Sequence, residues 1–82
     1  MNEEIIDEVC EILEYIMENT TVPRNIREVA STSKDMLLDE EMEDSIKVSK
    51  VLGNLDEISN DPNIPVHART LIWEVLSKLE SI

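Results

Sequence analysis

The chain has 82 residues, enough for a single hydrophobic core, and the core must be built from Ile, Leu, Val and Met because Phe is absent. Nineteen acidic and seven basic residues give a net charge of -12, which repels phosphate backbones and anionic lipid headgroups. Neither nucleic acid nor a membrane is therefore expected as a partner. One cysteine, no long apolar stretch and an acidic N-terminus without a signal region predict a cytoplasmic protein without internal disulfides.

Two helices are predicted in the first half of the chain. Apolar residues recur at helical spacing over residues 3–19, and the acids fall outside that stripe. Thr20, Thr21 and Pro23 then interrupt the pattern. We expect Thr21 to cap a second helix over residues 22–38, because threonine is a favoured N-cap and proline is tolerated in a first turn.

Two more helices are predicted in the second half. The acidic run at residues 39–44 lacks the spacing and glycine of a calcium loop, and favours a helix start capped by Asp39. The third helix is expected over residues 40–59, with Gly53 marking a close crossing by another helix. A break around Pro62 and Pro65 precedes a fourth helix over residues 64–81.

An offset of 42 residues aligns the two halves of the chain. It pairs Leu13 with Leu55, Pro23 with Pro65 and Arg27 with Arg69, among other matches. Each half then has an apolar helix, a capping residue, a proline and an arginine four residues later. The sequence therefore predicts one all-α domain over residues 1–82, an up-and-down four-helix bundle made of two similar helical hairpins.

Two strings of the sequence resemble the uncharacterised protein family 0147. They are residues 22–27, which read VPRNIR, and residues 55–73, which read LDEISNDPNIPVHARTLIW. The resemblance covers nearly the whole chain. It implies a small helical bundle in an archaeal cytoplasm, and because that family has no assigned function, it supplies no catalytic residues.

One end of the predicted bundle carries the candidate binding residues. Short connections place the first and third loops at the same end, and the three arginines of the chain lie in or just after those loops. The second and fourth helices also begin there, and helix N-termini favour anions. The candidate binding residues are Arg24, Asn25, Arg27, Asn63, His67, Arg69 and Trp73.

A structural role competes with binding at two of these arginines. Arg27 and Arg69 are expected to pair with Glu18, Glu57 or Asp61 and so to fix the hairpin corners. Arg24 has no counterpart in the repeat and is the arginine expected to be available to a partner. Trp73 is either a half-buried edge of the core or an interface anchor.

The sequence names no catalytic set. His67 is the single histidine, Cys10 lies on another helix, and Ile64 stands where a di-iron bundle would have the glutamate of a Glu-x-x-His motif. We therefore expect no enzyme, no metal and no cofactor. The leading hypothesis is a protein-interaction module or small adaptor, with an unknown protein partner or self-association. The alternatives are a small-anion or nucleotide-phosphate binder at the arginine-bearing end, and a purely structural subunit of a larger assembly.

Overall fold

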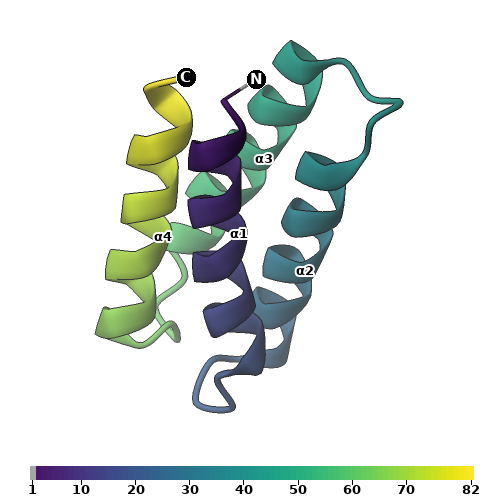
Figure 1. Ribbon diagram of the computed structural model, residues 1–82. Coiled ribbons are helices and arrows are strands. Elements are labelled where there is room, and N and C mark those ends of the chain that lie inside the picture. Colours follow the sequence, from purple (N-terminus) through teal and green to yellow (C-terminus); the bar gives the residue numbers. More distant parts are fainter. Residues whose placement is uncertain (1) are drawn as a thin grey trace.

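The computed structural model describes residues 2–82, which form four α-helices. They are α1 (Glu3–Glu18), α2 (Arg24–Leu38), α3 (Asp44–Ser59) and α4 (Val66–Glu80). Consecutive helices run antiparallel, and both termini lie at the same end as the α2–α3 loop (Figure 1). α1 and α3 each contact both α2 and α4, so the four helices close into one bundle. The predicted all-α four-helix fold is confirmed.

The helices after the first begin later than the sequence pattern indicated. The N-caps are Pro23, Glu43 and Pro65, none of which forms a side-chain capping hydrogen bond. The predicted caps were wrong, because those side chains serve the loops instead. Thr21 donates its hydroxyl to Asn19 Oδ1 at 2.7 Å, and the Asp39 carboxylate accepts from the amide of Glu41 at 2.9 Å.

All three loops contain the same turn. The side-chain oxygens of Asn19, Asp39 and Asp61 each accept from the backbone amide two residues on, at 3.0, 2.9 and 2.8 Å. Such turns are typical of Asn and Asp because their short side chains replace a backbone acceptor. This turn keeps residues 39–43 out of α3, which explains why that helix begins at Asp44 and not at residue 40.

A cation closes each loop from the fourth residue of the following helix. Arg27 donates from Nε to the carbonyl of Val22 at 3.1 Å. Lys47 donates from Nζ to the carbonyls of Leu37 and Asp39. Arg69 donates in the same manner to the carbonyls of Ser59 and Asp61 in the α3–α4 loop. Positive charge near the final carbonyls of a helix also offsets the negative end of its dipole.

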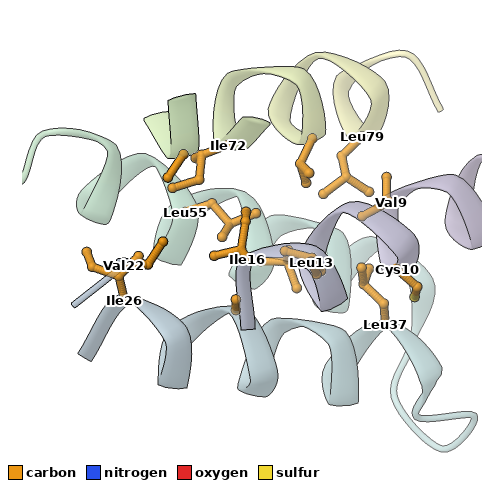
Figure 2. Packing of buried hydrophobic residues seen from close by; sticks show 14 of the residues in the cluster. Val9, Cys10, Leu13, Ile16, Val22, Ile26, Leu37, Leu55, Ile72 and Leu79 are labelled. Atoms are coloured by element: carbon orange, nitrogen blue, oxygen red, sulfur yellow. The ribbon is translucent and has the colours of Figure 1, made fainter. Parts of the chain in front are cut away.

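The core is a continuous cluster of Ile, Leu, Val and Ala with contributions from every helix, shown in Figure 2. α1 contributes Leu13 and Ile16 near its centre, and both are at most 1% exposed. Burying one such side chain stabilises a fold by about 1.5–3 kcal/mol. The buried residues of α1 are Ile6, Val9, Cys10, Leu13 and Ile16.

The prediction of a close helix crossing at Gly53 was wrong. Gly53 is exposed, and a Cβ atom added there would meet no heavy atom within 4 Å. The glycine therefore lowers the helix propensity of α3 without permitting any closer packing.

Candidate functional site

The α1–α2 loop and the α3–α4 loop lie together at one end of the bundle (Figure 1). We call this end, comprising both loops and the first turns of α2 and α4, the arginine pole. Asn19 Nδ2 lies 2.9 Å from His67 Nε2 and so joins the two loops. The backbone amide and the hydroxyl of Thr21 both donate to Asn19 Oδ1. This leaves Asn19 Nδ2 to face His67. Because Nδ2 only donates, His67 Nε2 is the acceptor.

Asn19 was missed by the sequence analysis. The Asn-x-Thr spacing indicates only its local turn, because the same spacing occurs in the equivalent turn from Asp61 to Asn63. The contact with His67 spans 48 residues of sequence, and no local pattern indicates it.

Arg27 and Arg69 lie at the arginine pole, but they do not form the expected pairs with carboxylates. Arg27 Nε donates to the Val22 carbonyl, as described above. Arg69 donates from Nε to the Ser59 carbonyl at 3.1 Å and from Nη2 to the Asp61 carbonyl at 2.9 Å. Both arginines therefore fix their hairpin corners by donating to backbone carbonyls. Asp61 does contribute, but through its main-chain oxygen and not its carboxylate.

Arg24 lies on the surface of the same pole. Its Nε is 3.2 Å from Glu28 Oε1, and the two side chains are 86% and 67% exposed. An ion pair this exposed contributes little to stability, so a partner can replace it at small cost. Asn25, Asn63 and His67 are also exposed.

α4 carries two exposed apolar side chains, Trp73 at 55% and Val66 at 76%. They share the flank of α4 that carries Arg69, and this flank faces α3 because Arg69 bonds to the end of that helix. We call Val66 and Trp73 the Trp73 flank. The opposite flank of α4 faces α1, where Lys78 Nζ lies 2.9 Å from Glu8 Oε2.

An apolar pocket of about 560 Å³ lies along α3 and reaches Ile82, just beyond the end of α4. We call it the α3–α4 groove. Its lining contains one charged side chain, and Ile82 closes it from beyond the end of α4. The lining residues are Asp44, Ser45, Val48, Ser49, Leu52 and Ile82.

A second pocket, of about 510 Å³, lies at the opposite end of the bundle from the arginine pole. Four of its eight lining residues are acidic, and Lys47 is its one basic residue. Lys47 is buried and bound to the carbonyls of the α2–α3 corner. The lining residues are Glu3, Ile6, Asp7, Leu37, Leu38, Glu40, Asp44 and Lys47.

The perturbed titratable groups lie away from the arginine pole. Burial raises the pKa of the Cys10 thiol, which lowers its thiolate fraction and its reactivity. Lys34 and Lys78 donate hydrogen bonds to the carboxylates of Glu14 and Glu8, respectively, and these bonds raise the pKa of both lysines. Within residues 2–82, no three His, Cys, Asp or Glu side chains are grouped so that they could hold a metal ion. No helix in that range is long and apolar enough to span a bilayer.

The sequence matches the model of the uncharacterised protein family UPF0147 over residues 1–82, and the chain belongs to that family. This confirms the resemblance seen in the sequence. Its archaeal relatives include a UPF0147 protein of Methanothermobacter thermautotrophicus, 54% identical over all of this chain and 80% of that protein. Another, from Thermococcus kodakarensis, is 42% identical over 96% of both chains.

Two solved structures share the fold. The crystal structure of a family member from Thermoplasma acidophilum has a TM-score of 0.93 and 39% identity, covering 98% of this chain and 94% of that one. The crystal structure of a protein of unknown function has a TM-score of 0.92 and 43% identity, covering 100% and 93%. The family remains uncharacterised, so function has to be argued from the site.

Proposed function

We propose that this chain is a non-enzymatic protein-interaction module, a small adaptor of the archaeal cytoplasm, which binds its partner through the arginine pole and the Trp73 flank. The observation that supports it best is the exposure of Trp73, the single tryptophan of the chain, on the same flank as the exposed Val66. Tryptophan and arginine are the residues most enriched at binding hot spots. Arg24 adds an exposed guanidinium at the adjoining pole.

The contacts of the reactive residues favour binding over catalysis. His67 Nε2 accepts from Asn19, so the nitrogen that a general base would use is already occupied. Cys10 is buried on α1 and its raised pKa disfavours the nucleophilic thiolate. Its single, buried, free thiol is also typical of the reducing cytoplasm. The net charge of -12 supports a protein partner over nucleic acid or a membrane surface.

Small-anion or nucleotide-phosphate binding at the arginine pole is the second candidate. α2 and α4 both begin there at prolines without a side-chain cap, so their first-turn amides have no capping acceptor. We rank it lower because Arg27 and Arg69 both direct donors to corner carbonyls. A phosphate titration followed by thermal unfolding separates the two. If phosphate stabilises the chain, and Arg24→Glu abolishes that effect while Trp73→Ala preserves it, the anion site gains support over the adaptor.

The adaptor proposal is tested by affinity capture from a native archaeal extract. The bait is either the unaltered chain or an Arg24→Glu, Trp73→Ala double variant shown by circular dichroism to be folded. Tyr15→Ala is the matched control, because Tyr15 is an exposed aromatic residue of α1, 58% exposed, outside the proposed surface. We expect a partner that the unaltered chain and Tyr15→Ala retain and the double variant loses. Identical recovery by all three baits would contradict the proposal.

Self-association is tested on the same three proteins by sedimentation velocity. A dimer that the double variant alone loses would identify a second copy as the partner. A monomer at all concentrations would leave a different protein as the partner. An isolated chain that aggregates through an exposed Trp73 would instead favour the structural subunit of a larger assembly.

A further inference from the structure

The floor of the α3–α4 groove is apolar and accessible. Val48 and Leu52 pack against the core with one side and line the groove with the other. Ile82 is 45% exposed at its end. Ser45 and Ser49 add small, uncharged side chains, which leave space for a partner to approach.

Trp73 extends this apolar surface towards the arginine pole. α3 and α4 are antiparallel neighbours, and their bounds place Trp73 at about the height of Leu52, on the flank that faces α3. Val66 lies two turns further along the same flank. α4 runs from Val66 to Glu80, which corresponds to about 21 Å at 1.5 Å per residue, and Ile82 lies two residues beyond its end.

One carboxylate lines the groove, and helical spacing places two more along its extension. Asp44 lines the groove, Asp56 follows Leu52 by one helical turn, and Glu80 follows Trp73 by two turns. Asp56 and Glu80 are exposed. Arg69 is the basic residue of this flank, and it is bound to the corner carbonyls. An apolar strip between carboxylates complements a helix with an apolar stripe and basic edges.

We propose that the α3–α4 groove, with the Trp73 flank, binds an amphipathic helix with basic edges that belongs to the partner protein. This inference rests on the proposed interaction function and specifies the chemistry of its partner. The groove supplies apolar contact for side chains at helical spacing, and the carboxylates orient the basic edges. A second copy of this chain is a poor occupant, because it would bring another charge of -12 against the same carboxylates.

The test uses a 16-residue peptide of leucine and lysine with its leucines at positions i, i+3, i+4 and i+7. A scrambled peptide of the same composition has no apolar stripe, and a leucine–glutamate peptide has the opposite charge. Affinity is measured by calorimetry. Because Trp73 is the single tryptophan, its fluorescence reports directly on the flank. We expect binding and a blue shift of Trp73 emission with the first peptide alone.

Two groove variants locate the bound peptide. Trp73→Ala removes the aromatic anchor, and Ser49→Glu places a carboxylate in the groove at an exposed position where the fold tolerates it. Each should weaken binding at least about tenfold, the loss typical of a hot-spot contact. Thr32→Glu adds the same charge on the exposed face of α2, and Tyr15→Ala removes the other aromatic side chain. Both controls should bind within about twofold of the unaltered chain.

Three results would overturn the inference. Equal binding of the scrambled peptide would show that the apolar stripe is irrelevant. Unchanged or tighter binding by Ser49→Glu would show that non-specific charge attraction holds the peptide elsewhere. A dimer of the free chain that Ser49→Glu dissociates would make a second copy the occupant.

Failure of this inference can be distinguished from failure of the adaptor proposal by including Ser49→Glu in the extract capture. A partner lost from the Arg24→Glu, Trp73→Ala chain but retained by Ser49→Glu supports the adaptor and overturns the groove. A partner lost from both variants supports the adaptor proposal and the groove as its binding site.

Discussion

The two sides of the bundle differ in how completely their helices are joined. α1 is held on both flanks, since Lys34 of α2 reaches Glu14 at 2.8 Å and Lys78 of α4 reaches Glu8 at 2.9 Å. On the other side, an apolar groove lined by α3 and Ile82 is open, and Trp73 of α4 is exposed. α1 thus has ion pairs to both of its neighbours, and the α3–α4 side carries the surface that we propose binds a partner.

The largest expected effect contrasts two leucines. Leu13 of α1 is completely buried, so Leu13→Ala should lower the free energy of unfolding by about 2–5 kcal/mol. Leu52 is partly exposed in the groove, so Leu52→Ala should cost about 1 kcal/mol. Urea denaturation measures both. Equal losses would mean that the groove is closed in solution and that the contrast between the sides is wrong.

The comparison extends to the two loops that are closed by an arginine. Arg69 makes two hydrogen bonds to the α3–α4 corner, and Arg27 makes one to the α1–α2 corner. Because bonds from a charged donor contribute about 1.5–3 kcal/mol, Arg69→Met should lower the free energy of unfolding by about 2–3 kcal/mol and Arg27→Met by about 1.5. The exposed Lys50→Met is the control and should stay within about 0.5 kcal/mol. A smaller loss for Arg69→Met than for Arg27→Met would contradict the role of Arg69.

Ser33 is a polar residue within the buried interior. It is completely buried on α2, and its hydroxyl has no hydrogen-bond partner among the described residues. Ser33→Ala should therefore raise the free energy of unfolding by about 1 kcal/mol. Ser59→Ala is the matched control, because Ser59 is also buried but donates to the Asp56 carbonyl at 2.7 Å. Thermal and urea unfolding should show opposite signs for the two variants, and a loss at both would indicate that Ser33 is hydrogen-bonded.

The smallest expected effect is on the open side, at Gly53. Its surroundings are empty, so Gly53→Ala should stabilise the chain by about 0.8–1 kcal/mol through helix propensity alone. Thr32→Ala makes a comparable exposed change in α2 and should gain at most about 0.5 kcal/mol. Destabilisation by Gly53→Ala would indicate that another helix packs closely against Gly53 in solution, as the sequence predicted.

The sequence was sufficient for the fold where packing alone decides the structure. The spacing of Val9, Leu13 and Ile16 predicts α1, and those three residues are at most 1% exposed. It was insufficient at the start of α3, where a carboxylate can cap a helix or form a local turn. Asp39 formed the turn, and the helix began at Asp44.

The site was only partly predictable for related reasons. The sequence identified Arg27 and Arg69 as corner residues, but it does not distinguish carboxylate acceptors from carbonyls, which every residue carries. The contact between Asn19 and His67 depends on the meeting of two loops. The groove depends on where Ile82 lies relative to α3, and hydrophobic spacing carries no information about that placement.

The most direct test of the contrast between the two sides is an amide chemical-shift map of the chain with the leucine–lysine peptide. The largest shifts should fall on the α3–α4 groove and on the Trp73 indole, with small shifts along the exposed face of α1 and α2. The largest shifts on α1 or α2, or a uniform pattern over all acidic surfaces, would contradict it.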